Sequence, residues 1–282
     1  MDIRVLGRGD ELRLDAFLSS YRDSSMFLRS NARRGGLEYA GQPYQGVYCG
    51  VFEDGQLRGV AAHYWTGKVV LQAPRRARDV ARACVEASGR QVSGLVGPTA
   101  QVFVARDALG LAEAPTLIDG SEWLYGLDLT ELVVPGALAR GEVTCRPPQP
   151  EERETLCRWR LAYDIELLGA TDTPQTRRYS SEFLDRQIAE SNAWVLLDRG
   201  QLVSLSGFNA NLPDMVQLGG IYTPPELRGR GYAKAAVAGS LLAAGLRGVS
   251  RAVLFTSTAS AARAYEGIGF RRTGDYCMVL LT

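Results

Sequence analysis

The sequence predicts an α/β (α+β) protein that contains two copies of one fold in tandem. The chain of 282 residues is long for one domain of roughly 100–200 residues and suits two. Short strands and hairpins alternate with amphipathic helices in the same order in both halves. Two short segments also recur: residues 55–57 match residues 200–202 at an offset of 145, and residues 108–111 resemble residues 267–270 at an offset of 159.

Each half is expected to contain a hairpin followed by alternating helices and strands. In the first half, Asp54-Gly55 is a strong hairpin signal, and serine at residues 24–25 can cap the second part of a broken helix. Helices are expected at residues 10–34, 78–87, 99–109, 151–168, 181–191, 235–246 and 260–266. Strands are expected at residues 46–52, 57–64, 69–72, 92–96, 122–129, 193–197, 202–208, 215–222, 252–256 and 276–281.

Residues 130–141 form the expected linker, because proline and glycine interrupt both helical and strand patterns there. The expected domains are therefore residues 1–135 and residues 142–282. The second copy is longer than the first, and much of the excess falls where the second copy carries prolines and a glycine-rich loop. We therefore expect only the second domain to have kept that loop.

Composition and charge exclude several classes of protein. Lysine plus arginine number 32 and aspartate plus glutamate 31, so charge favours neither nucleic acid nor an anionic membrane as the main partner. Five scattered cysteines without a C-x-x-C pair, and one histidine, predict neither a disulfide framework nor a metal site. The first residues lack the apolar stretch of a secretory signal. We expect a cytoplasmic protein, monomeric or homodimeric, with no nucleic-acid or membrane partner.

A glycine-rich stretch, residues 228–233 with the sequence Arg-Gly-Arg-Gly-Tyr-Ala, lies between the apolar strand of residues 215–222 and a helix. Two prolines end the strand, because proline cannot donate to a sheet. At a helix N-terminus the first N–H groups lack partners and the helix dipole is positive. Gly229 and Gly231 let the backbone approach a ligand closely. The stretch therefore predicts an anion site, for which phosphate or pyrophosphate is the best candidate.

Two landmarks in the second half resemble those of the GNAT superfamily of acyl-CoA N-acetyltransferases. One is the pattern Arg-x-x-Gly-x-Ala of residues 228–233, which follows a strand and two prolines, and the other is a helix that carries Tyr265 and closes on Gly269-Phe270. The resemblance covers residues 149–282, and the internal repeat extends it to the first half. It implies a tandem-domain member with a degenerate N-terminal copy. Each GNAT-like domain would be a mixed, mostly antiparallel sheet flanked by helices.

The resemblance also implies acetyl-CoA as co-substrate and no metal. Its pyrophosphate would lie on the N–H groups of the loop, and its pantetheine arm would pair with the edge of the preceding strand. A bulge or bend is plausible at Gly219-Gly220. Thr258 stands where the family often has an asparagine. The expected cofactor contacts are Ile221, Tyr222, Thr223, Arg228, Gly229, Arg230, Gly231, Tyr232, Ala233 and Thr258.

The implied reaction is the transfer of an acetyl (acyl) group from acetyl-CoA to a primary amine of a small molecule, peptide or protein by direct attack. Tyr265 is the expected general acid, because a tyrosine can lend a proton to a departing thiolate. Glu166 is the preferred general base, and Asp164 and Asp214 are further candidates. The alternative is a non-catalytic acyl-CoA sensor or interaction module, because the loop glycines indicate binding but not turnover.

The first copy is expected to bind no cofactor. Its connection at residues 73–76 has no glycine that would let the backbone approach a pyrophosphate, and Arg106 stands at the position that corresponds to Tyr265. We therefore expect the chain to bind one CoA, in its second half. His63 is expected to be structural, and the arginines of residues 75–78 are interpreted as an exposed helix start or, alternatively, an anion patch.

Overall fold

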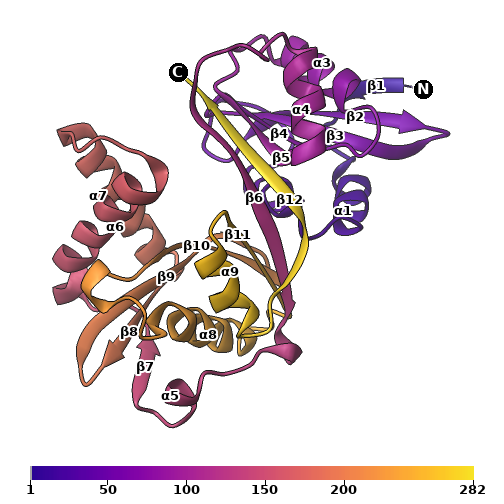
Figure 1. The fold of residues 1–282 in the computed structure, drawn as a ribbon. Coiled ribbons are helices and arrows are strands. Elements are labelled where there is room, and N and C mark those ends of the chain that lie inside the picture. The colour runs from indigo at the N-terminus through magenta and orange to yellow at the C-terminus, as the bar shows by residue number, and fades with distance from the viewer. Residues whose placement is uncertain (1) are drawn as a thin grey trace. The chain divides into compact units, whose positions relative to one another are not determined.

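The structure, a computed structural model, describes residues 2–282 and places helices on both faces of mixed, mostly antiparallel sheets (Figure 1). The chain forms two compact units, one made of Met1–Leu124 with Thr273–Thr282 and the other of Tyr125–Arg272. The predicted α/β fold class is confirmed. Within residues 2–282, no helix is both long enough and apolar enough to cross a membrane.

The first unit has the strand order β1-β2-β3-β4-β5-β12. Neighbouring strands are antiparallel except for β4 and β5, which run parallel. The strands are β1 (Asp2–Val5), β2 (Gly46–Glu53), β3 (Gln56–Tyr64), β4 (Lys68–Gln72), β5 (Gly94–Pro98) and β12 (Arg271–Leu281). The helices are α1 (Glu11–Ser19), α2 (Met26–Gly35), α3 (Ala77–Ser88) and α4 (Thr99–Ala108).

The main core of the first unit lies between its sheet and helices α3 and α4. Val80 and Cys84 of α3 are buried against inward side chains of β2 to β5, and Val102 of α4 joins the same cluster. Cys277 and Val279 of β12 complete it from the other end of the chain. Helix α1 lies on the opposite side of these strands from α3 (Figure 1).

The second unit has the strand order β6-β11-β10-β9-β8-β7. Strand β10 runs parallel to β11 and antiparallel to β9, and β9, β8 and β7 pair antiparallel. The strands are β6 (Thr116–Asp128, of which Tyr125–Asp128 belong to this unit), β7 (Val143–Arg146), β8 (Ala193–Asp198), β9 (Gln201–Asn211), β10 (Met215–Tyr222) and β11 (Arg251–Thr256). The helices are α5 (Gly136–Ala139), α6 (Arg153–Leu168), α7 (Pro174–Ala189), α8 (Tyr232–Gly245) and α9 (Ala259–Glu266). The 3₁₀ turns are η1 (Leu129–Glu131), η2 (Pro150–Glu152) and η3 (Pro225–Leu227).

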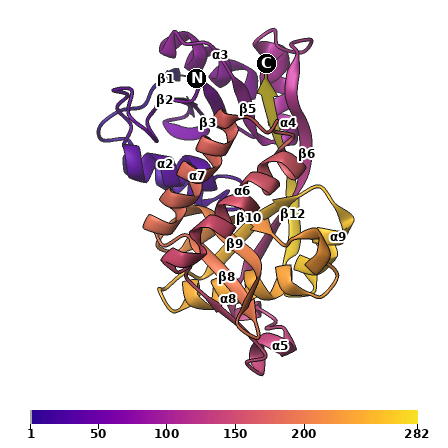
Figure 2. The ribbon, with the colours of Figure 1, turned by 90° about the vertical axis from the view of Figure 1, so that its left-hand side faces the viewer.

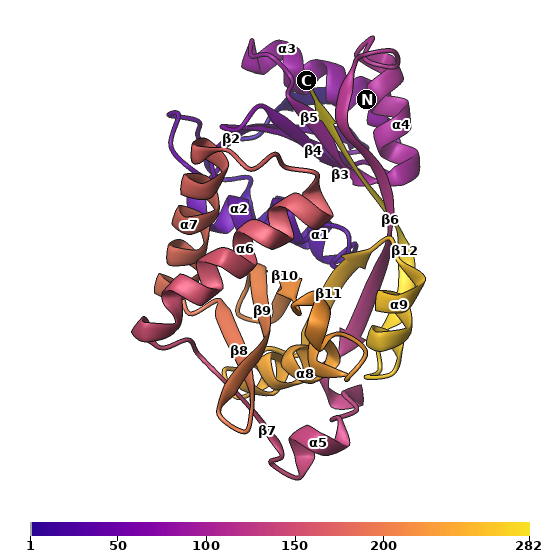
Figure 3. The same ribbon diagram turned by 60° about the vertical axis from the view of Figure 1, so that its left-hand side comes forward.

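Helices α6 and α7 cover one face of the second sheet, and α8 covers the other (Figures 2 and 3). Leu156 of α6 and Leu184 of α7 are buried against β8 and β9. Ala235 and Ala236 of α8 are buried against β7, β8 and β9. These small side chains let α8 approach the sheet closely. Residues 223–231 connect the end of β10 to the start of this helix.

The two units share one strand order, as the internal repeat predicted. Strands β7 to β11 of the second unit have the same order as β1 to β5 of the first. In each unit, the sixth strand comes from the other half of the chain: β12 pairs with β5, and β6 lies beside β11. The ranges 1–135 and 142–282 stay a prediction about domains. The compact units are bounded differently, because residues 273–282 complete the sheet of the first unit.

Most elements lie where the sequence predicted them, and β10 has the predicted bounds. Two short strands, β1 and β7, were not predicted. Helix α7 begins at Pro174 rather than at residue 181. Its start carries a signal that hydrophobic periodicity misses: the Thr173 hydroxyl accepts a hydrogen bond from the Thr176 N–H at 3.1 Å, and proline fits the first helical position.

We expect Val279→Ala to loosen the first unit and leave the second unchanged. Val279 is fully buried in the core of the first unit, so the loss of two methyl groups should lower the free energy of unfolding by about 2 kcal/mol. Hydrogen–deuterium exchange should become faster in peptides from β4 and β5. Thr273→Ala, on an exposed position of the same strand, serves as control. Faster exchange confined to β8–β10 would instead assign β12 to the second unit.

Candidate functional site

The loop between β10 and α8 adopts a backbone conformation that glycine takes readily. Gly229 and Gly231 have φ angles of +78° and +79°, in the left-handed region that disfavours residues with a Cβ atom. A Cβ on Gly231 would also lie 3.1 Å from Lys234 Cε. Gly231 directly precedes α8. These two residues therefore let the chain turn from the end of a strand into the start of a helix.

Unpaired backbone N–H groups gather at this helix start. The Ala235 N–H makes a 3.1 Å bond to the Gly231 carbonyl, and the Arg228 N–H bonds the Pro225 carbonyl at 3.2 Å. Among residues 2–282, no acceptor contacts the N–H groups of residues 229–234. Free N–H groups at the positive end of a helix dipole attract anions. The local geometry that the sequence predicted for an anion site is therefore present.

Arg228, predicted as a cation of this anion site, is bound within the protein. Its Nη1 and Nη2 donate to the two carboxylate oxygens of Glu166 at 2.7 Å each, and its Nε donates to the Thr223 carbonyl at 2.9 Å. Its guanidinium carbon lies 5.7 Å from the centroid of the Tyr222 ring. The ion pair joins the C-terminal end of α6 to the loop. The positive charge of Arg228 is therefore already compensated.

Arg230 and Tyr232 are placed differently from Arg228. Arg230 is exposed, and its Nη2 lies 3.5 Å from the Glu226 carbonyl, at the limit of a hydrogen bond. The Tyr232 hydroxyl donates to the Asp198 carboxylate on β8. This hydrogen bond raises the pKa of Tyr232. The guanidinium of Arg230 is therefore the cation of the loop that can turn toward a ligand at little cost.

The ion pair weakens Glu166 as a base. The hydrogen bond from Arg228, together with its charge, lowers the pKa of Glu166. Asp164, another candidate base, is 3% exposed and accepts hydrogen bonds from Arg160 at 2.7 Å and from the Ser180 hydroxyl at 2.5 Å. Both carboxylates already accept hydrogen bonds within the protein in this arrangement. The base role of Glu166 stays a prediction, and it requires that Arg228 first leave the carboxylate.

Asp214 and Thr258 hold local structure. The Asp214 carbonyl accepts a hydrogen bond from the Ser250 N–H at 3.0 Å, which ties the turn before β10 to the start of β11. The Thr258 hydroxyl caps α9 by accepting a hydrogen bond from the Ala261 N–H at 3.3 Å. A hydroxyl that accepts a capping bond can still donate its own proton. Thr258 therefore retains one hydrogen-bonding direction for a cofactor.

Tyr265 lies near the end of α9, where it is 8% exposed. Its ring packs edge-to-face against Phe270 with centroids 6.1 Å apart. Its hydroxyl has no hydrogen-bond partner among residues 2–282. Burial raises the pKa of Tyr265, with a smaller contribution from the nearby Tyr163. The hydroxyl therefore stays protonated at neutral pH and is free to donate, although the raised pKa makes it a weaker acid than a solvated tyrosine.

Strand β10 loses one of its two neighbours before it reaches the loop. Its parallel register with β11 runs from Met215 opposite Arg251 to Gln217 opposite Val253, whereas its pairing with β9 continues to Tyr222. Within the described residues, the last part of β10 thus has an open edge on the side of β11. An open edge of this kind can accept an extended ligand as an additional strand.

The bulge predicted at the glycine pair is confirmed. The register of β10 against β9 shifts between Gly219 and Tyr222, and Gly220 has a φ of +65°. A Cβ on Gly219 would lie 1.9 Å from Asn209 Nδ2, so a larger residue there would force that exposed side chain to move. Two carbonyls beyond the bulge already have partners: Tyr222 accepts from the Ser204 hydroxyl at 3.1 Å, and Thr223 accepts from Arg228. The predicted pairing of the pantetheine arm with Ile221–Thr223 therefore has to use backbone groups other than these two carbonyls.

A buried ion pair that the sequence did not reveal lies beside this bulge. Arg160 donates to both oxygens of Asp164 at 3.1 and 2.7 Å, and its guanidinium carbon lies 3.9 Å from the centroid of the Phe183 ring. Arg160 lines a cavity of about 20 Å³ that reaches Gly219 and Gly220. The four-residue spacing of Arg160 and Asp164 was visible in the sequence. Their burial was not, because charged pairs at this spacing usually lie on exposed helix faces.

The corresponding residues of the first unit are structural. Arg106 donates to the Asp119 carboxylate at 2.7 Å and to the Leu111 carbonyl at 3.0 Å. His63 is fully buried and contacts the Ser88 hydroxyl at 2.6 Å and the Gly67 carbonyl at 3.1 Å, as expected of a structural histidine. Where the second unit has Tyr265, the first unit therefore has an arginine that is held by an ion pair.

Part of the sequence matches a known protein family. Residues 157–270 match the model of the Acetyltransferase (GNAT) family, a segment that runs from α6 to the end of the turn after α9. Among curated proteins, none matches the sequence significantly.

Solved structures are similar over nearly the whole chain. An acetyltransferase of the GNAT family from Colwellia psychrerythraea is 14% identical, with 100% of both chains covered and a TM-score of 0.55. A GCN5-related N-acetyltransferase from Sphaerobacter thermophilus is 14% identical, with 99% of this chain and 94% of that chain covered and a TM-score of 0.58. A tandem GNAT protein from the clavulanic acid biosynthesis pathway is 12% identical, with 99% and 97% covered and a TM-score of 0.53.

At these identities the structural likeness establishes the fold, and it extends to both units. The matched family segment contains β10, the glycine-rich loop, α8 and α9, which are the elements that carried the resemblance in the sequence. Residues 157–270, in the second unit, therefore form a domain that matches the GNAT family of acetyltransferases, and the chain as a whole has a tandem GNAT fold.

Proposed function

We propose that the second unit transfers an acetyl group from acetyl-CoA to a primary amine of a small molecule, peptide or protein. The observation that carries this proposal is the row of unpaired N–H groups of residues 229–234, in a domain that belongs to an acetyltransferase family. A pyrophosphate is an anion of the right kind for such a row. Residues Arg228–Ala233 would hold it, with Arg230 as the adjacent mobile cation.

The open edge of β10 supports the binding of the rest of the co-substrate. The pantetheine arm carries amide groups, which can pair with a strand edge as an added strand does. In this proposal the arm lies beside Ile221 and Thr223, past the bulge at Gly220. A backbone N–H near the bulge would donate to the thioester carbonyl and stabilise the negative charge that develops on its oxygen.

The reaction proceeds by direct attack. The neutral amine nitrogen forms a bond to the thioester carbon, the carbon–sulfur bond breaks, and CoA leaves as a thiolate. Tyr265 donates its phenolic proton to that sulfur, and the amine loses one proton to a base. The raised pKa of Tyr265 keeps the hydroxyl protonated at neutral pH, so the donor form is present before each turnover.

The pair between Glu166 and Arg228 can couple binding to catalysis. The two side chains are 39% and 44% exposed, so their pairing is weak enough to be exchanged. A pyrophosphate on the loop would compete with Glu166 for the guanidinium of Arg228. Its departure would free the carboxylate and return its pKa toward the ordinary range. Glu166 would then act as the general base in the loaded enzyme only.

Five free cysteines fit a reducing compartment, so we place the enzyme in the cytoplasm, as a monomer or homodimer. The connection of residues 73–76 contains no glycine, so the first unit would bind no CoA. The chain would therefore bind one CoA.

The function is tested by measuring free-thiol release from acetyl-CoA with a panel of amines and amino-terminal peptides. We expect release with at least one acceptor. Tyr265→Phe should lower turnover by about 10²–10⁴-fold, or less because a thiolate leaves readily, without changing CoA affinity. The buried hydroxyl has no partner to lose, so stability should be unchanged. Tight CoA binding without release to any acceptor would instead indicate an acyl-CoA sensor.

We expect Gly231→Val to abolish CoA binding, because a branched side chain strains a residue with a φ of +79° and blocks close approach of the pyrophosphate. Calorimetry should give a stoichiometry near one for the unaltered chain and no heat for the variant. Gly248→Val is the matched control: Gly248 has a φ of +93° and lies in the turn after α8, so its replacement causes similar strain away from the loop. Unchanged affinity in Gly231→Val would refute the pyrophosphate assignment.

We expect Glu166→Gln to bind CoA up to about fivefold more tightly, because Arg228 no longer has a carboxylate partner and an exposed pair of this kind contributes at most about 1 kcal/mol. Turnover should fall by about 10²-fold or more near pH 7. The deficit should shrink as pH rises, because more of the amine is then already neutral. Glu226→Gln, on the same loop, should change neither quantity. Tighter binding with normal turnover would limit Glu166 to restraining Arg228.

A further inference from the structure

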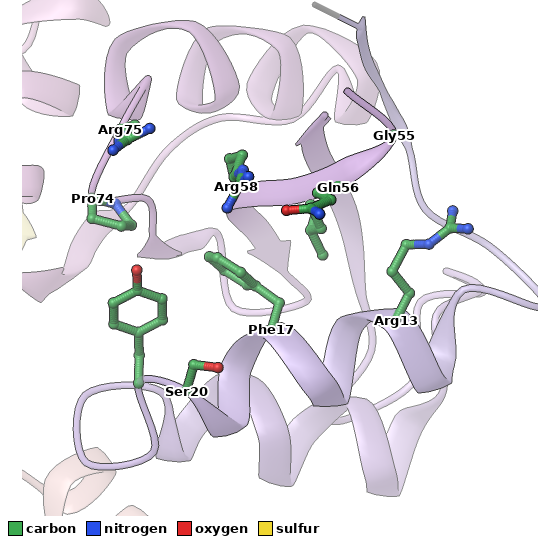
Figure 4. A pocket seen from close by; sticks show the side chains of 10 residues that line it. Arg13, Phe17, Ser20, Gly55, Gln56, Arg58, Pro74 and Arg75 are labelled. Atoms are coloured by element: carbon green, nitrogen blue, oxygen red, sulfur yellow. The ribbon is translucent and has the colours of Figure 1, made fainter. Parts of the chain in front are cut away.

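A cavity of about 520 Å³ lies in the first unit, apart from the proposed acetyl-transfer site in the second. Figure 4 shows Phe17 on α1 and Ser20 directly after that helix at one side, with Gln56 and Arg58 on β3 and the Pro74–Arg75 connection opposite. None of the residues that line it is acidic, whereas three are arginines: Arg13, Arg58 and Arg75. The cavity is therefore a strongly cationic pocket.

Arg58 is the central cation of this pocket. Its Nε atom is buried and has no hydrogen-bond partner, and within residues 2–282 its guanidinium forms no ion pair. A buried donor on a charged group is costly when it is unmet, and such donors usually have a protein, solvent or ligand partner. Figure 4 shows its side chain between Gln56 and Pro74, at the cavity. The side chain therefore has an unused capacity to bind an anion where the cavity offers room for one.

The charges of the other two arginines also remain available. Arg75 forms no ion pair among the described residues. Arg13 lies 3.7 Å from an oxygen of Asp10, but both oxygens of that carboxylate already accept hydrogen bonds of 2.7 Å from Arg4. Arg76, the next residue after Arg75, is different because it pairs with carboxylates outside the cavity. Within residues 2–282, Arg58 and Arg75 thus bring positive charge without a carboxylate partner to the cavity, and Arg13 brings charge that is only partly compensated.

The wall formed by α1 and the turn after it is aromatic. Phe17 and Tyr21 lie with ring centroids 5.3 Å apart at an angle of 54°. Both rings line the cavity, and Tyr21 is 38% exposed. Aromatic rings bury flat apolar groups well and stack with other rings. The cavity therefore sets guanidinium groups opposite an aromatic wall.

We propose that this cavity binds a small anion with a flat apolar group: an aromatic carboxylate or an aromatic phosphate ester. The planar fork of a guanidinium matches two oxygens of either oxyanion, and Arg58 and Arg75 can supply it. Phe17 and Tyr21 would contact the flat group. The volume of about 520 Å³ falls in the range of small-molecule sites. The first copy, which lacks the glycine-rich loop, would thus bind its ligand through side chains rather than through backbone N–H groups.

The test is calorimetric titration of the full chain with phenyl phosphate and with benzoate. Inorganic phosphate supplies the anion without the ring, and phenol supplies the ring without the anion. We expect phenyl phosphate or benzoate to bind at least tenfold more tightly than either, with an affinity that falls as salt rises. The two probes distinguish the phosphate ester from the carboxylate. Failure of both to bind would overturn the proposal.

Variants separate this pocket from general surface charge. Arg58→Gln and Arg75→Gln should each weaken binding of the better probe about tenfold or more, and Phe17→Leu should weaken it severalfold. Arg78→Gln removes the same charge from an exposed pair with Asp107, outside the cavity, and should leave the affinity unchanged. Equal weakening by Arg58→Gln and Arg78→Gln would overturn the proposal.

Two further measurements test the role of Arg58 and the identity of the ligand. Without ligand, Arg58→Gln should keep or raise the melting temperature, because it removes a buried Nε donor that has no hydrogen-bond partner in the described part of the chain; a marked drop would make Arg58 a structural residue and overturn the proposal. CoA should not displace the bound probe. Displacement by CoA, with a stoichiometry of two, would identify the cavity as a second CoA site instead.

Discussion

The candidate site of the second unit depends on one feature of its sheet: β10 stops pairing with β11 before it stops pairing with β9. Buried backbone N–H and C=O groups must be paired, and β10 meets this requirement against β9 up to Tyr222 but against β11 only to Gln217. The bulge at Gly220 and the left-handed residues Gly229 and Gly231 carry the chain from this open edge to the start of α8. The result is two sets of available backbone groups, one at the open edge of β10 and one at the N–H groups of residues 229–234. The site is therefore made largely of backbone, and side chains modulate it.

Two ion pairs of the second unit that involve α6 differ in burial: one is buried, and the other is partly exposed and can exchange its partner for another charge. Arg160 and Asp164 are almost fully buried, and further hydrogen bonding from Ser180 satisfies the carboxylate, so this pair is a fixed part of the fold. Glu166 and Arg228 are partly exposed, and their pairing has to compete with water and with any anion on the loop. The difference in burial assigns the two pairs to different tasks, although each joins a glutamate or aspartate of α6 to an arginine.

The two units show how one fold supports different sites. Each has five strands in the same order, and each receives its sixth strand from the other half of the chain. In the second unit the connection after the fourth of these strands is a glycine-rich loop that exposes N–H groups. In the first unit it is short and contains Pro74 and Arg75, and a cationic cavity with an aromatic wall lies beside it. The first unit has a packed core without a glycine-rich loop, so the core does not depend on that loop.

The sequence by itself predicted the GNAT resemblance of the second half, the fold class and the repeat, because glycine positions, strand–helix alternation and the Tyr265 helix are patterns that short segments of the chain carry. It also located the loop, the β10 bounds and the bulge, since each depends on residues adjacent in the chain. Only the tertiary structure decided that Arg228 is held by Glu166, that Asp164 is buried, and that β12 completes the first unit. These facts depend on contacts between residues that are distant in sequence or on burial, and neither leaves a periodic signal. Tertiary packing therefore decides which charges pair and which strands are neighbours, whereas local backbone conformation decides where turns and helix starts form.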